Sequence, residues 1–156
     1  MGYTIIDILD KAILIQNRQI DIFTDIINEN NNINIVKVLS KILINKSRKT
    51  INYYENLKNS AVSLNIEEID IMTYDKISFL INEFNTRIYV TSISNAKEYL
   101  KFTCNLLKDV YSLFIDIQGR LINNSYPKSG ITYNILSEII LDLNQQIKDV
   151  ENTLYT

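Results

Sequence analysis

Four long segments of the chain carry apolar residues at alternating spacings of three and four. In the first segment two such rows lie next to each other: Ile6, Leu9, Ile13, Gln16, Ile20, Phe23 and Ile27, and beside them Ile5, Ile8, Ala12, Ile15, Gln19, Ile22 and Ile26. Two adjacent rows form a wide apolar face, which is typical of a helix that packs into the core of a bundle. Thr4 followed by Asp7 predicts the helix start as a shortened capping box. The run of Asn30, Asn31 and Asn32 predicts its end.

The other three long segments follow the same rule. A second helix is predicted over residues 33–61, with the inward row Val36, Leu39, Leu43, Ser47, Thr50, Tyr54 and Leu57. A third is predicted to begin near Ser94, as its cap, with the row Ala96, Leu100, Thr103, Leu107, Val110, Phe114, Ile117 and Leu121. Pro127 and Gly130 separate it from a fourth helix with the row Leu136, Ile139, Leu143, Gln146 and Val150.

The connections between these helices predict the topology. The first and second helices are tightly joined, as are the third and fourth, whereas about 30 residues link the second to the third. Residues 74–86 of this link predict a short amphipathic helix, and Ile88 to Val90 predict an extended segment. We therefore expect an all-α four-helix bundle over residues 1–156, in which a long crossover with a short helix joins two antiparallel helix pairs.

Composition excludes several kinds of chemistry. The chain has 156 residues, no histidine and one cysteine. It therefore has no Ser-His-Asp or Cys-His nucleophile system, and no intrachain disulfide or multi-cysteine zinc site. The apolar and charged fractions, 46% and 22%, are close to those of ordinary globular domains.

The compartment is predicted from what the chain lacks. We expect no secretory signal and no membrane-spanning segment, because no basic and apolar leader and no run of about 18 apolar residues is visible. A single cysteine, Cys104, fits a reducing cytoplasm, and we expect it to be a small buried apolar residue rather than a reactive thiol. Heavy use of isoleucine and asparagine is a bias of AT-rich genomes and favours a bacterial source.

The two halves of the chain also resemble each other. In the first helix Phe23 follows Gln16 by seven residues, and in the third Phe114 follows Leu107 by seven. Together with the segments at residues 47–57 and 143–151, this register resembles the rubrerythrin branch of the ferritin-like superfamily over nearly the whole chain. The resemblance implies a di-iron or di-manganese site in the core, with one Glu on each of the first and third helices and a Glu-x-x-His on each of the other two.

The positions that the resemblance assigns to these ligands hold other residue types here. They are Gln16, the pair Ser47 and Thr50, Leu107, and the pair Leu143 and Gln146. None is a carboxylate or an imidazole, and a hard di-metal centre needs carboxylates as ligands and to neutralise the metal charge. We therefore expect a non-catalytic, metal-free, ferritin-like protein without a cofactor, which acts through protein interaction or a structural role. The four polar residues would then form a buried hydrogen-bond cluster, or a small polar pocket.

Two other functions stay open at this stage. One is a di-metal oxidoreductase or iron-binding protein with a shifted metal site, built from carboxylates such as Glu55, Glu138 or Glu151. The other is a helical bundle that binds a small molecule or lipid in an apolar cavity between its helices.

Charge and tyrosine content bear on partners. Residues 33–63 carry a net charge of +5 and residues 1–31 a net charge of −3, so we expect complementary helix faces, with a patch for an acidic partner as the alternative. The overall charge of −2 argues against a nucleic-acid partner.

The tyrosines expected at exposed or interface positions are Tyr89, Tyr126, Tyr133 and Tyr155, whereas Tyr53, Tyr54, Tyr99 and Tyr111 lie on or near inward rows. Wide isoleucine-rich faces favour a homodimer, and an unknown protein partner stays open as well.

Overall fold

The computed structural model describes residues 2–90, 92–122 and 130–156. Over these residues the chain forms five helices: α1 (Ile5–Glu29), α2 (Asn34–Val62), α3 (Ile71–Arg87), α4 (Ala96–Ile122) and α5 (Ile131–Tyr155). The described residues contain no strand, and an isolated antiparallel bridge joins Tyr3 to Ile69. The predicted all-α class is confirmed.

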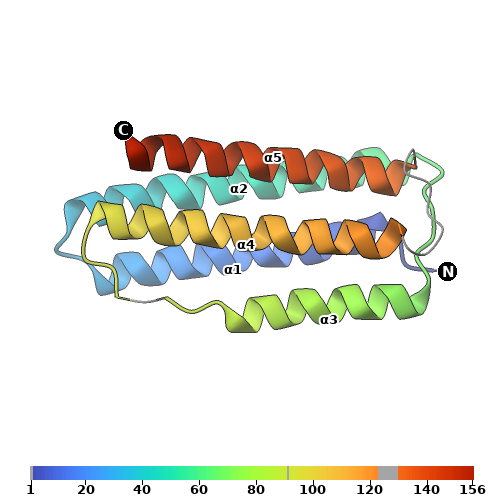
Figure 1. The fold of residues 1–156 in the computed structure, drawn as a ribbon, viewed down its shortest axis with the longest axis horizontal. Helices are drawn as coiled ribbons and strands as arrows, with labels where there is room; N and C mark the ends of the chain where they lie inside the picture. The colour runs from blue at the N-terminus through green and yellow to red at the C-terminus, as the bar shows by residue number, and fades with distance from the viewer. Residues whose placement is uncertain (1, 91, 123–129) are drawn as a thin grey trace.

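The four long helices lie side by side, and α3 runs along one side of them (Figure 1). α1 packs against α2, and α4 packs against α5, while α3 contacts α1 and α4. Residues 63–95 lead from the first helix pair to the second and contain α3. This placement of a fifth helix beside α4 creates the surface described below.

The two ends of α1 follow the predicted signals. The Thr4 backbone N–H donates to the Asp7 carboxylate at 2.8 Å, and the Thr4 hydroxyl accepts from the Ile6 N–H at 3.2 Å, which completes a capping box. The helix ends at Glu29, and Asn30 caps its C-terminus. The polar run after Glu29 therefore does end the helix, as predicted.

The short helix of the crossover is longer than predicted and begins three residues earlier, at Ile71. The reason is an N-cap at Asp70, whose carboxylate accepts from the Thr73 N–H at 3.0 Å and from the Thr73 hydroxyl at 2.6 Å. The first turn is also held by Tyr74, whose ring stacks on that of Tyr3 with a centroid distance of 3.7 Å. Ile88 follows the helix with an extended backbone.

The predicted cap of the next helix was wrong by one residue. α4 begins at Ala96, and the side chain that caps it belongs to Asn95, whose Oδ1 accepts from the Glu98 N–H at 2.9 Å. Ser94 instead donates its N–H and its hydroxyl to the Glu98 carboxylate. Gly130 precedes α5 as predicted, and Pro127 lies outside the described residues.

Two apolar clusters fill the bundle. The larger contains Phe114 and joins the N-terminal half of α1, the C-terminal half of α2, α3, most of α4 and α5. The smaller contains Phe23 and joins the C-terminal half of α1, the N-terminal half of α2 and the first turns of α4. We call them the Phe114 cluster and the Phe23 cluster. Among the described residues, no helix contains an apolar stretch that could span a lipid bilayer.

Candidate functional site

A band of polar side chains separates the two apolar clusters along α1 and α2. On α1 the Phe114 cluster ends at Ile15 and the Phe23 cluster begins at Ile22. On α2 the Phe23 cluster ends at Ile44 and the Phe114 cluster resumes at Tyr54. The polar residues in this interval, with those that meet them from α4 and α5, are Gln16, Gln19, Ser47, Thr50, Thr103 and Gln146. We call this set the polar belt.

The structure brings four of the six predicted ligand positions together. Ser47, Leu107 and Gln146 line one small cavity of about 20 Å³, and Gln146 Nε2 donates to Thr50 Oγ1 at 3.5 Å. Leu143 lies one turn before Gln146 and is fully buried.

The sixth position, Gln16, lies one turn before Gln19 on α1, and Gln19 lines the same cavity. Gln16 is 3% exposed. Five of the six positions are buried, and Gln146 is partly buried.

Hydrogen bonds of the belt form two separate groups rather than one network, one joining Ser47 to Gln19 and the other joining Gln146, Thr50 and their neighbours. The Ser47 hydroxyl donates to Gln19 Oε1 at 3.5 Å, which is long for such a bond. Thr50 donates to the Lys46 carbonyl of its own helix at 3.1 Å. The best bond of Gln146 goes to Asp142 of its own helix, at 2.7 Å. The belt therefore joins α1 to α2 and α2 to α5 only weakly.

Gln19 is a belt residue that the sequence did not single out, although it lies on a predicted inward row. It is 3% exposed, and its Nε2 has no hydrogen-bond partner among the described residues. The adjacent cavity has room for one water molecule. The signal that could have identified Gln19 is a second amide on an apolar row, one turn after Gln16.

Replacing Gln19 with methionine should raise the free energy of unfolding by about 1 kcal/mol, because the loss of a buried unpaired donor outweighs the loss of the long 3.5 Å bond from Ser47, and the side-chain volume is retained. Urea denaturation measures this change. The matched control is Gln118→Met, since Gln118 donates to the Tyr133 carbonyl at 3.2 Å and to Ser137 Oγ at 2.8 Å. The control should lose about 1 kcal/mol, and an equal loss in both variants would contradict the expectation.

Three inward tyrosines differ in how their hydroxyls are satisfied. Tyr99 shares a buried 2.6 Å hydrogen bond with Ser40, which joins α2 to α4. The Tyr54 hydroxyl has no partner among the described residues, and burial, followed by Asp142 and Tyr53, raises its pKa. Burial, with smaller contributions from Glu138 and Asp142, raises the pKa of Tyr53 to about 12. Burial also raises the pKa of Tyr99 to about 12, and the Ser40 hydrogen bond opposes it.

These raised pKa values predict a loss of stability at alkaline pH. The folded chain holds the phenol protons of Tyr53, Tyr54 and Tyr99 more tightly than the unfolded chain, whose tyrosines titrate near pH 10. The contribution of these tyrosines to the free energy of unfolding is therefore complete below about pH 10, and it falls as the pH rises further. Thermal melts from neutral pH upward should show the melting temperature falling at alkaline pH. The substitution Tyr99→Phe should make this fall with pH less steep. A slope unchanged by the substitution would contradict the assignment.

The carboxylates considered for a shifted metal site form no metal-binding group among the described residues. Glu55 pairs with Lys58 at 3.6 Å, and Glu151 pairs with Lys108 at 3.8 Å. Glu138 is exposed on α5. Among the described residues, no three cysteine, aspartate or glutamate side chains form a group that could hold a metal ion. Cys104 is buried and carries a free thiol.

The expected charge complementarity between α1 and α2 is present at one point. Lys58 pairs with Asp10 across the two helices, and the hydrogen bond to Asp10 is the largest contribution that raises the pKa of Lys58. The other cations of α2 lie outside ion-pair distance of every described carboxylate.

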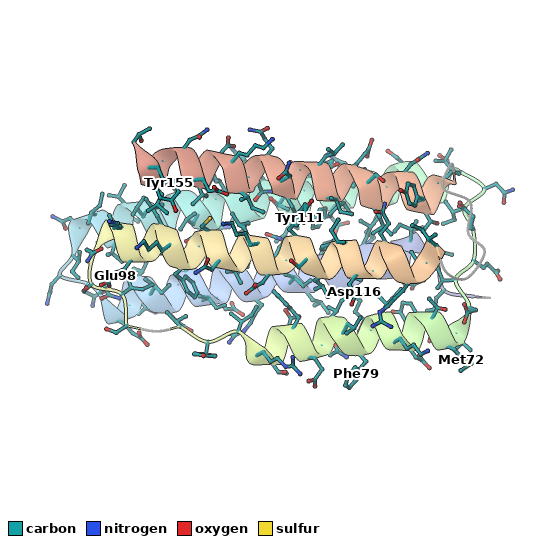
Figure 2. All side chains as sticks on the ribbon, in the orientation of Figure 1. Met72, Phe79, Glu98, Tyr111, Asp116 and Tyr155 are labelled. Atoms are coloured by element: carbon teal, nitrogen blue, oxygen red, sulfur yellow. The ribbon has the colours of Figure 1, made fainter. Side chains whose placement is uncertain are left out.

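A groove of about 910 Å³ opens between α3, residues 88, 89, 92 and 93, and α4. Its apolar lining includes buried Ile93, Leu106 and Leu113 and the more exposed Phe79, Leu80, Phe84, Ile88, Tyr89 and Phe102. Tyr89 is 78% exposed and Phe79 is 63% exposed, and the prediction of an exposed Tyr89 is confirmed. In Figure 2, Phe79 lies on α3, while Glu98 and Asp116 lie on α4. Exposed aromatic side chains beside a hollow are typical of binding surfaces.

Acidic side chains predominate at the rim of this groove. The charged lining residues are Glu83, Arg87, Glu98, Lys101, Asp109 and Asp116, with a net charge of −2 (two cations and four anions). Glu83 pairs with Arg87 at 3.0 Å. The two hydrogen bonds from Ser94 are the leading causes that lower the pKa of Glu98, so its carboxylate stays charged at neutral pH. The groove thus combines an apolar, aromatic lining with a negative rim.

Comparison with known proteins provides no independent assignment for this groove or for the polar belt. The chain matches no family model, no curated protein sequence and no solved structure.

Proposed function

We propose that this protein is a non-catalytic helical bundle that acts by binding another protein in the groove between α3 and α4. The observation that carries this function is the groove itself, which is apolar, rich in aromatic residues and open to solvent over about 910 Å³. Tyr89 and Phe79 are the exposed aromatic anchors, and such residues dominate binding energy at protein interfaces.

The core supports a non-catalytic role through the residues that it contains. Two of the positions that the ferritin-like resemblance assigns to glutamates hold leucines, Leu107 and Leu143, and both are buried. Gln16, Ser47 and Thr50 are neutral and buried as well, so none of these side chains supplies the charge that hard metal ions require. We therefore propose a metal-free bundle of ferritin-like descent.

A small-molecule site inside the bundle has little support from the packing. The cavity at the polar belt has a volume of about 20 Å³, which is far below the roughly 300–1,000 Å³ of ligand pockets. The groove falls within that range, but its open shape and charged rim favour a protein segment over a small apolar ligand. The buried free thiol of Cys104 accords with the reducing cytoplasm that we propose as its compartment.

Affinity capture from the native host tests this function. The bait variant Phe79→Ala with Tyr89→Ala removes the exposed aromatic anchors and leaves the described core unchanged. The matched control, Leu14→Ala with Leu141→Ala, truncates two apolar residues that are exposed on α1 and α5. We expect partners captured by the natural chain to be lost with the first bait and retained with the control. Equal capture by both baits would overturn the assignment to the groove.

A further inference from the structure

The outer face of α2 carries positive charge that the rest of the described chain does not balance. Five exposed cations lie on it: Lys37, Lys41, Lys46, Arg48 and Lys49. None lies within 4.0 Å of a described carboxylate. Residues 30–54 contain no Asp or Glu, so this face cannot neutralise itself.

Beside the flank of α2 that holds Lys37, Lys41 and Arg48, the helix exposes an apolar row. Ile35, Val38 and Ile42 are 49%, 52% and 49% exposed, and their spacings of three and four place them on one side of the helix. Lys46 and Lys49 continue the row by the same spacings. We call the surface formed by these five residues the α2 stripe. It combines β-branched apolar side chains with a positive end.

The α2 stripe matches the groove in charge and in length. The groove rim has a net charge of −2, and Asp109 lies on it without an ion pair to any described cation. From Ile35 to Lys49 a helix rises by about 21 Å. Along α4 the groove extends from Glu98 to Asp116, which corresponds to about 27 Å. An amphipathic helix laid in an apolar groove is a common mode of recognition.

We infer that the occupant of the groove is the α2 stripe of a second copy of this chain. This inference depends on the proposed function, because it names the partner of the same groove. No residue of α2 lines the groove of its own chain, so the two surfaces are free to act together. They are different surfaces, and the contact therefore joins the groove of one copy to the stripe of another.

Sedimentation velocity with two complementary variants tests this contact. The stripe variant is Val38→Glu with Ile42→Glu, and the groove variant is Phe79→Ala with Tyr89→Ala. All four residues are exposed by about half or more, and circular dichroism verifies that each variant folds. The control, Leu14→Glu with Leu141→Glu, places the same charges on exposed positions outside both surfaces.

We expect the natural chain and the control to self-associate, and rising salt to weaken the association. Each variant alone should associate at least about 30-fold more weakly. In a mixture, the stripe variant supplies an intact groove and the groove variant supplies an intact stripe. One chain of each should therefore bind, and the complex should not grow beyond two chains.

A natural chain that stays monomeric at every concentration would overturn the inference. Association that survives in both variants, or a mixture that forms no complex, would overturn it as well. If self-association fails while the groove bait still loses a cellular partner, the proposed function stands and only its occupant is wrong. If self-association fails and the groove bait captures every protein that the natural chain captures, the proposed function and the inferred occupant of the groove are both wrong.

Discussion

Restoring the six ligands that the ferritin-like resemblance implies should leave the metal-free chain unfolded at neutral pH and make its folding depend on metal. The substitutions are Gln16→Glu, Ser47→Glu, Thr50→His, Leu107→Glu, Leu143→Glu and Gln146→His. Each uncompensated buried charge costs about 3–5 kcal/mol, and the entire stability of a domain is only about 5–15 kcal/mol. Manganese(II) or iron(II) should restore the fold, because two divalent ions neutralise the four carboxylates. Circular dichroism melts with and without metal measure both effects.

A matched control tests whether the proposed register is correct. It carries Asn17→Glu in place of Gln16→Glu, and so moves one carboxylate to the exposed neighbour on α1. Because this ligand then faces solvent, the melting temperature in the presence of metal should be lower than that of the six-residue variant with metal. A six-residue variant that stays unfolded in excess metal, or a control that responds equally, would rule out the ferritin-like register.

The second largest expected effect concerns two buried phenylalanines, one in each half of the chain. Phe23 and Phe114 are 2% and 1% exposed, and each lies in one of the two apolar clusters. Truncation to alanine should therefore lower the free energy of unfolding by about 3–5 kcal/mol in each case, because transfer energy is lost and a cavity remains. Guanidinium denaturation provides the measurement.

Phe79→Ala is the matched control for these truncations. Phe79 is 63% exposed, so the same change should alter the free energy of unfolding by no more than about 0.5 kcal/mol. A loss at Phe79 that equals the loss at Phe114 would contradict the distinction between a core aromatic and a binding aromatic.

Much of the fold could be predicted because local signals agree with periodicity. Thr4 and Asp7 start α1 and Asn30 ends it, as their side-chain chemistry requires. Apolar periodicity alone did not locate the start of α3, because the cap formed by Asp70 and Thr73 leaves no mark on an apolar row. At α4, two capping residue types stand next to each other, and only the local geometry decides for Asn95 over Ser94.

The groove could not be predicted, because periodicity identifies an apolar face but not what covers it. The apolar residues that α3 carries on one face by their spacing include two that are fully buried, Ile77 and Ile81, and these contact the core. Leu80 and Phe84 of the same face are only partly buried and line the groove. The difference arises from how α3 lies against α1 and α4 (Figure 1), which depends on contacts distant in sequence.

The polar belt was foreseen in part. Polar residues on apolar rows pointed to Gln16, Ser47, Thr50 and Gln146 as interior positions, and the first three are buried. Their hydrogen-bond partners could not be foreseen, because side chains of α2 and α5 meet only after the helix pairs pack. Gln146, for example, bonds more closely to Asp142 of its own helix, at 2.7 Å, than to Thr50, at 3.5 Å.

Whether this bundle works through its surface or through a metal in its core is decided most directly by the metal content of the natural chain. The protein is purified without chelator from cells grown in medium rich in iron and manganese, and elemental analysis gives the ions bound per chain. The refolded six-residue variant, loaded with metal, provides the positive control. We predict that the natural chain holds only trace metal. Near-stoichiometric, tightly held iron or manganese would contradict a metal-free bundle.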